Sequence, residues 1–218
     1  MSRRDMLHRN DLRFVAAVTD LDADEWSAAS LCDEWTNHDV LAHLVVGYGG
    51  GLGPMIAEMY RHGGSFDGAN TALACALAAT RTPAELLDDF ARLIDQPRGT
   101  GRLLPRRMMV GDHVTHELDV IYALGREPDI CPDVLVAVLK TQVSLPNPFV
   151  PAFMNSRGLS LVATDADWAY GRGPEVRGRA AELVSVLGNR PKMLCRLSGD
   201  GVPVLSERVL SRRCRTAG

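Results

Sequence analysis

Apolar residues recur at helical spacing through the first two-thirds of the chain. Those from Leu12 to Val18 predict a helix over about residues 5–19. Thr36, followed three residues later by Asp39, predicts the N-cap of a second helix with a variant of the capping box. This helix runs through an apolar segment and ends at a cluster of glycines, because glycine is a poor helix former.

Prolines and glycines mark the ends of further predicted helices. Pro54 follows the glycine cluster and suits a first helical turn. Periodic segments predict two more helices over about residues 83–94 and 132–143. Between them, Pro105 begins a helix that Gly125 can end in the left-handed conformation.

The periodicity changes near residue 150. The segments LSLVAT (159–164) and WAYGRGPEVRG (168–178) are short, bounded by turn residues and typical of strands. RAAELVSVLG (179–188) predicts a helix that ends in a glycine cap. We therefore predict a mainly α protein, with a helical bundle over residues 1–150 and a small α+β segment over residues 151–218.

The predicted helix that follows Pro105 is apolar on most sides yet carries five ionisable residues within eight positions: Asp112, His113, His116, Glu117 and Asp119. At about 100° per residue, Asp112, His116 and Asp119 lie within about 60° of one another. A helix that is apolar on its other sides lies in a core, so this stripe faces the interior or a cleft. An unpaired buried carboxylate costs several kcal/mol unless it is paired or binds a cation.

A metal ion would account for this stripe. Asp112 and His116 are four residues apart, so they lie one above the other and can bind one ion. His43, which also lies in an apolar helical segment, is the best candidate for a third ligand. Three nitrogen and oxygen ligands are typical of catalytic metal sites, favour zinc and accommodate nickel, cobalt, manganese or iron. Asp119 would then orient an imidazole or position a water, which is its predicted catalytic role.

The residues alone leave other interpretations open. A single histidine on an apolar face is usually a hydrogen-bonded core residue, and an Asp–His pair four apart is usually a surface ion pair. His113 and Glu117 form a competing pair, which we expect to pair internally or to face solvent. Arg102, Arg106 and Arg107 could bind an anionic substrate or a thiol cofactor, although such arginines are more often solvated.

Composition narrows the classes of function and partner. The net charge of -3 at pH 7 offers no general attraction for nucleic acid or an anionic membrane. Neither a signal-peptide core nor an apolar run long enough to span a membrane occurs. The five cysteines form no CxxC pair and their odd number suits a reducing cytosol, so we expect a cytoplasmic protein. No G-x-S-x-G motif supports a protein nucleophile.

Two segments resemble the metal motifs of the mycothiol-dependent maleylpyruvate isomerase family, which belongs to the DinB-like metal-binding bundles. LCDEWTNHDVLAHL is similar to W-T-x-x-D-V-x-x-H-L. GDHVTHELDVIYALG is similar to a second motif, in which an acidic residue lies four positions before a histidine. TDADWAYGRGPEVRGRAAELVSVLGNRP resembles the tail of actinobacterial members. The resemblance implies a DinB-like up-down four-helix bundle with a small C-terminal α+β segment.

The resemblance also implies a function. It makes His43, Asp112 and His116 the divalent-metal triad, with Asp112 in place of the isomerase's glutamate. It implies mycothiol as a thiol cosubstrate and a small electrophile as substrate, in a transferase or isomerase reaction. A metal-dependent hydrolase and a non-catalytic module, with His113 as a fourth ligand, are the alternatives. Such bundles are also compatible with a homodimer.

Overall fold

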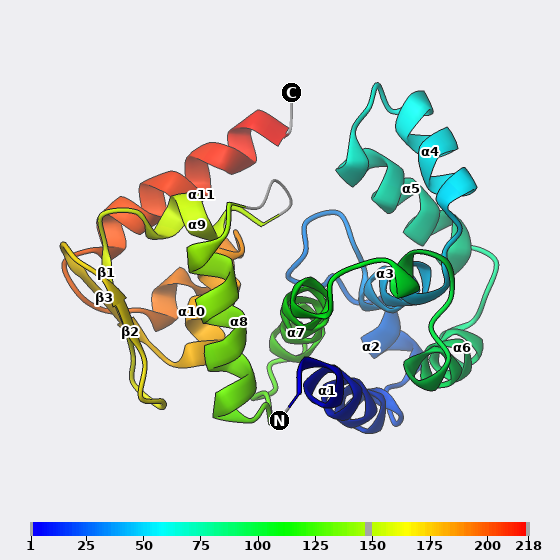
Figure 1. Cartoon of the computed structure of the whole chain (residues 1–218), viewed down its shortest axis with the longest axis horizontal. Helices are drawn as coiled ribbons and strands as arrows, with labels where there is room; N and C mark the ends of the chain where they lie inside the picture. The colour runs from blue at the N-terminus through cyan, green and yellow to red at the C-terminus, as the bar shows by residue number, and fades with distance from the viewer. Residues whose placement is uncertain (1, 147–149, 217–218) are drawn as a thin grey trace. The chain divides into compact units, whose positions relative to one another are not determined.

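The computed structural model describes residues 2–146 and 150–216, with side chains up to residue 211. The protein is mainly helical, with a small three-stranded sheet in its C-terminal part (Figure 1), as the sequence predicts. Its contacts divide it into two compact units, Met1–Arg126 and Glu127–Gly218. Within the described residues, no helix combines the length and the apolarity that crossing a bilayer requires.

The first unit contains a four-helix bundle. Helix α1 packs against α6 and α7, and α3 packs against the same two helices (Figure 1). Outside this ring, α5 packs on α3 and α4 packs on α5. The elements of this unit, in chain order, are α1 (Arg3–Val18), α2 (Ala23–Ser27), α3 (Asn37–Gly49), α4 (Leu52–Arg61), α5 (Phe66–Ala78), α6 (Pro83–Asp95), the 3-10 helix η1 (Gly99–Arg102) and α7 (Arg106–Ala123).

Local sequence signals set the ends of the helices that carry the site. Thr36 caps α3, where the Asp39 amide donates to the threonine hydroxyl and the Asp39 carboxylate accepts from the Thr36 amide, as predicted. Gly125, just beyond α7, has a φ of 67°, the left-handed conformation predicted for it. Helix α4 begins at Leu52, so Pro54 lies within its first turn, two residues after the start.

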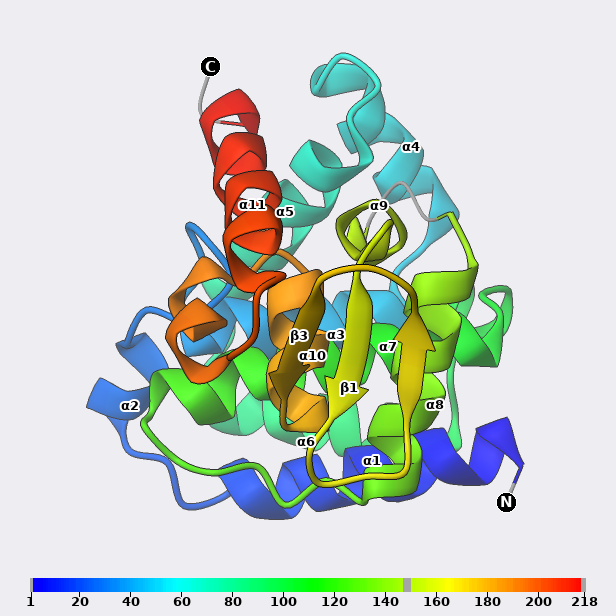
Figure 2. The same ribbon diagram turned by 90° about the vertical axis from the view of Figure 1, so that its left-hand side faces the viewer.

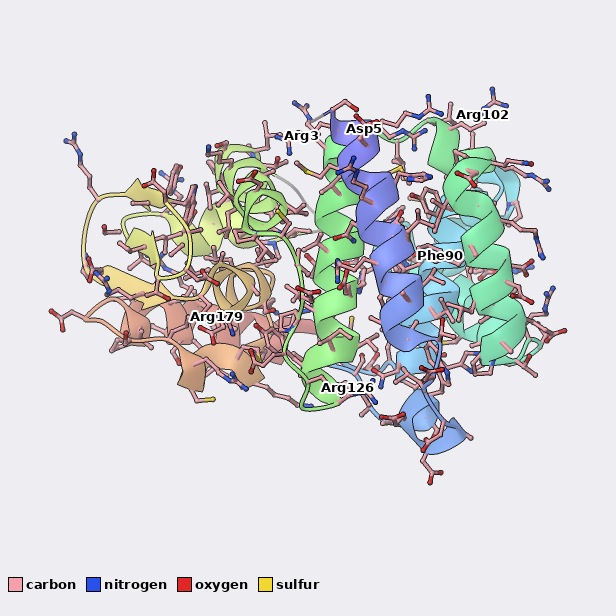
Figure 3. The ribbon with its side chains drawn as sticks, turned by 90° about the horizontal axis from the view of Figure 1, so that it is seen from below. Arg3, Asp5, Phe90, Arg102, Arg126 and Arg179 are labelled. Carbon is pink, nitrogen blue, oxygen red and sulfur yellow. The ribbon has the colours of Figure 1, made fainter. Side chains whose placement is uncertain are left out.

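Apolar and aromatic side chains fill the centre of the bundle. Phe14 on α1 and Phe90 on α6 meet edge to face, with ring centroids 6.0 Å apart. Figure 3 shows α1 beside both α6 and α7, with Phe90 between α1 and α6. Val114 and Leu118 add the buried apolar side of α7. Each such side chain contributes about 1.5–3 kcal/mol on burial, so packing fixes where α7 lies.

The second unit consists of a small sheet and helices. Strand β1 (Ser160–Ala163) pairs antiparallel with β2 (Ala169–Gly171) and parallel with β3 (Glu175–Gly178), so it is central (Figure 2). Helix α10 (Ala180–Leu187) packs on β3 and on α8. These strands and α10 match the predicted elements. The remaining elements are α8 (Pro132–Ser144), α9 (Ala152–Ser156), η2 (Pro191–Arg196) and α11 (Val202–Thr216), of which α9, η2 and α11 were not predicted.

The division between the units falls after Arg126, whereas the sequence predicts a boundary near residue 150. Helix α8 belongs to the second unit because it packs against α9 and α10. Its amphipathic pattern predicts a helix correctly but carries no information about which neighbour the apolar face covers.

Candidate metal centre

Helices α3 and α7 bring the three predicted metal ligands together. His43 Nε2 on α3 lies 3.3 Å from Asp112 Oδ2 on α7. His116 Nε2, one turn further along α7, lies 3.7 Å from Asp112 Oδ1. The two imidazole rings are 4.5 Å apart, centroid to centroid, and one ligand atom from each of the three residues lies within 4.8 Å of the others. Residues 69 positions apart in sequence thus form one cluster.

The spacing of the ligand atoms fits a divalent ion. Bonds of about 2.0–2.1 Å in a tetrahedral site place ligand atoms about 3.3 Å apart. The two imidazole–carboxylate distances are 3.3 and 3.7 Å, close to that value. Two imidazoles and a carboxylate are ligands that zinc and similar ions accept, and three protein ligands leave coordination positions for a substrate.

Hydrogen bonds behind the imidazoles direct the ring nitrogens. His43 Nδ1 lies 3.1 Å from Asn70 Oδ1 on α5, and His116 Nδ1 lies 3.0 Å from Asp119 Oδ2. If each Nδ1 donates to these oxygens, each Nε2 presents its lone pair toward Asp112, as a metal ligand requires. Asp119 is fully buried against His116, which agrees with its predicted position. Asn70 was missed by the sequence analysis.

Trp35 packs against both imidazole ligands. Its ring centroid lies 5.0 Å from that of His43 and 5.5 Å from that of His116, with the latter pair stacked. Trp35 is itself buried. The indole therefore covers one side of the cluster, whereas the Asp112 side chain is 42% exposed and marks the open side.

The protonation states of the ligands suit metal binding. Burial, followed by the neighbouring His43, lowers the pKa of His116, which keeps this imidazole neutral at pH 7. Desolvation opposes ionisation of Asp112, but the facing His43 and His116 outweigh it and hold the pKa of this carboxyl below its usual range. Neutral imidazole and ionised carboxylate are the forms that bind a metal ion.

The expectation that His113 and Glu117 pair with each other or face solvent is wrong. Both are buried, and both bind residues of α1. His113 Nδ1 lies 2.9 Å from Asp11 Oδ1, and the Tyr48 hydroxyl donates to the other oxygen of Asp11. Although burial alone would lower the pKa of His113, Asp11 outweighs it and raises the pKa. With its Nδ1 committed to Asp11, His113 is absent from the described cluster of ligand atoms.

Glu117 forms the second half of this network. Both of its carboxylate oxygens accept from the Arg13 guanidinium, and one also accepts from Asn10 Nδ2 at 3.2 Å. The five ionisable side chains between Asp112 and Asp119 therefore form two stripes. Asp112, His116 and Asp119 belong to the candidate metal centre, and the remaining two anchor α7 to α1.

The arginines predicted to bind a substrate or thiol lie near the start of α7. Arg106 is half-buried and donates to the Gly101 carbonyl at 3.0 Å. Its charge opposes the rise in the pKa of both Tyr48 and His113, but this effect is smaller than those of burial and of Asp11. Arg102 and Arg107 are exposed. Of the three, only Arg102 and Arg107 present their side chains largely to solvent.

A cysteine near the site was also missed. One ligand atom each from Cys32, His116 and Asp119 lie within 4.8 Å of one another. Cys32 has no second cysteine nearby in the sequence, so no thiol was predicted at the site. The available signal was the position of Cys32 in LCDEWTNHDVLAHL, the same segment that contains His43.

Comparisons with known proteins agree with this fold. Residues 7–107 match the family model described as the mycothiol maleylpyruvate isomerase N-terminal domain. The crystal structure of the mycothiol-dependent maleylpyruvate isomerase matches with a TM-score of 0.59 and 16% identity, over 91% of each chain. A mutant of that isomerase matches with a TM-score of 0.58 and 15% identity, also over 91% of each chain. At this identity, the two structures establish a shared fold. A comparison with curated proteins found no match.

Proposed function

We propose that this protein is a metal- and thiol-dependent transferase or isomerase. The premise is that the chain belongs, through residues 7–107, to the mycothiol maleylpyruvate isomerase N-terminal domain family. His43, Asp112 and His116 would hold a divalent ion, with zinc as the first candidate. The observation that carries this proposal is that two imidazoles turn their Nε2 atoms toward one carboxylate.

The chain's own residues would prepare this site. Asn70 and Asp119 hold the Nδ1 sides of His43 and His116, and so direct both Nε2 atoms to the same point. Trp35 covers the imidazoles and excludes water from that side, which strengthens electrostatic interactions in the site. A bound divalent ion supplies Lewis acidity, which deprotonates a coordinated thiol near neutral pH.

The proposed cosubstrate is mycothiol, and the proposed substrate is a small electrophile. The thiolate sulfur would form a bond to an electrophilic carbon. As this bond forms, the π bond of the electrophile would break and its electron pair would move to the neighbouring atom. An isomerase would then expel the thiolate and restore the double bond, whereas a transferase would retain the carbon–sulfur bond and place a proton on that atom. Arg107, exposed in the first turn of α7, is the proposed contact for an anionic group of substrate or thiol. Arg106 is the weaker candidate, because it already donates to the Gly101 carbonyl.

Metal content tests the first step of this proposal. Inductively coupled plasma mass spectrometry of the protein reconstituted with Zn²⁺ should find one zinc ion fewer per chain in His43→Ala and in Asp112→Ala than in the wild type. His8→Ala is the matched control, because His8 also pairs with an acidic residue but lies far along the chain, on α1. Absence of bound zinc in the wild type, or a zinc content that is unchanged in both site variants, would refute the metal centre.

Turnover tests the second step. The zinc-loaded protein should consume a reactive electrophile only when mycothiol is present, and His43→Ala should abolish that thiol-dependent rate. Equal turnover without thiol would indicate a hydrolase in which water replaces the thiol. Zinc binding without either activity would support a ligand-binding module of the same fold.

A further inference from the structure

His116 belongs to two groups of candidate ligand residues, and each of its ring nitrogens faces a carboxylate. Its Nε2 faces Asp112 at 3.7 Å, and its Nδ1 faces Asp119 Oδ2 at 3.0 Å. Ligand atoms of Cys32, His116 and Asp119 form a second group, all within 4.8 Å of one another. An imidazole can use both nitrogens at once, because their lone pairs point away from each other in the ring plane.

The loop before α3 holds Cys32 at this position. The Leu31 amide donates to the Asp119 carbonyl at 3.1 Å, which ties the loop directly to α7. The backbone of Cys32 is held at both its amide and its carbonyl. Its amide donates to Ser30 Oγ at 3.1 Å, and its carbonyl accepts from the Ser30 hydroxyl at 3.2 Å and from the Trp35 amide at 3.2 Å. The thiol therefore lies beside α7 because the backbone around it is anchored.

We propose that Cys32, His116 and Asp119 form a second cation site, selective for thiophilic divalent ions such as Zn²⁺ and Co²⁺. Thiolate, imidazole and carboxylate are all zinc ligands, and the thiolate distinguishes this site from the oxygen- and nitrogen-only cluster at His43. Asp119 is fully buried and His116 nearly so, whereas Cys32 is half-buried.

Charge balance permits both sites to be filled together. With one ion at the first site, the carboxylates of Asp112 and Asp119 balance its charge, while the Cys32 thiol and the His116 Nδ1–H keep their protons. A second divalent ion displaces these two protons to the solvent. The resulting thiolate and imidazolate add two negative charges, which match the added ion. A buried site needs such balance, because uncompensated charge is costly there.

The second site does not require the proposed thiol-transfer activity, and a Co²⁺ titration of the metal-free protein separates the two. Thiolate-bound Co²⁺ has an intense near-ultraviolet charge-transfer absorption that nitrogen and oxygen ligands do not give. The wild type should bind about two ions per chain and show this band. Cys32→Ser should remove the band and one ion, whereas Cys75→Ser, at another half-buried cysteine that lies outside the proposed site, should change neither.

The remaining variants assign each ion to its site. His43→Ala should remove one ion and keep the band, and His116→Ala should weaken both sites. An unchanged stoichiometry in His43→Ala would count against the first site alone. A band that is absent from the wild type, or that persists in Cys32→Ser, would overturn the second site.

Alkylation of the unmutated protein gives a test that does not depend on a variant folding. Zn²⁺ should slow the reaction of iodoacetamide with Cys32 at least tenfold, and mass spectrometry of peptides should show Cys75 unchanged. Equal alkylation of Cys32 with and without Zn²⁺ would also overturn the proposal.

Discussion

Replacing Arg13 by methionine isolates the contribution of the buried charges that anchor α7 to α1. Glu117 is fully buried, and both of its oxygens accept from Arg13. In Arg13→Met, only the hydrogen bond from Asn10 at 3.2 Å remains of the described contacts to this carboxylate. Removing one partner of a buried ion pair costs about 3–5 kcal/mol, because the other charge stays desolvated. We expect a loss of that size in the free energy of unfolding.

The loss should depend on pH. Burial already raises the pKa of Glu117 to about 7, although Arg13 and Asn10 oppose the shift, so removing Arg13 raises it further. Below the ordinary pKa of 4.5, Glu117 is protonated in both the folded and the unfolded state. As the pH rises above that value, the unfolded state releases its proton first, and stability falls until the pH passes the folded pKa. Arg13→Met should therefore lose more stability at pH 8 than at pH 5.

Urea denaturation followed by circular dichroism, at pH 5 and pH 8, measures these changes as shifts in the midpoint. Arg9→Met is the matched control, because Arg9 is an exposed arginine on the same helix, and it should change stability by less than about 0.5 kcal/mol. Arg13→Met combined with Glu117→Met removes both charges and should recover most of the loss. A single variant as stable as Arg9→Met, or a double variant no more stable than Arg13→Met, would refute the reasoning.

Three further predictions concern the metal centre and the glycines. Asn70→Ala should weaken Zn²⁺ binding about 10- to 100-fold by calorimetry, because it frees the ring of His43; unchanged affinity would contradict this role. Asp112→Glu should retain the ion, whereas Asp112→Asn should lose most of the affinity, and equal binding by both variants would show that the carboxylate is dispensable. Gly101→Ala should cost about 1–3 kcal/mol on thermal unfolding, because the added Cβ would lie 2.5 Å from the Tyr48 carbonyl oxygen. Gly111→Ala, with no atom within 4 Å of the added Cβ, should instead stabilise α7 by up to about 1 kcal/mol, and the opposite order of these two alanine variants would contradict the packing.

Helical periodicity explains why much of the site could be predicted. Residues four apart on a helix share a face, so Asp112 and His116 had to lie together once α7 formed. The capping box at Thr36 and Asp39 identifies the start of α3, which places His43 in the second turn of that helix. The pairing of these two helices rested on the resemblance and on the chemistry of the three side chains.

Other parts of the site could not be predicted, because they depend on tertiary contacts. Periodicity alone suggested that His113 and Glu117 pair with each other, but Asp11 and Arg13, about 100 positions earlier, are better partners. Asn70 was not predicted as a site residue because helix α5, which contains it, was not predicted. Its sequence, FDGANTALACALA, contains mostly small residues and a glycine, which weaken the apolar pattern.

The two stripes of α7 make the candidate metal centre depend on the rotational register of one helix. Asp112–His116 and His113–Glu117 are both acid–imidazole pairs, and they lie a single position, or about 100°, apart. A slip of α7 by one residue would therefore present a different pair to His43. The contacts of His113 and Glu117 with α1 hold the rotation in place. Buried charges outside the candidate metal centre thus select which side chains could bind an ion, and a deletion early in α7 would exchange one candidate ligand set for the other.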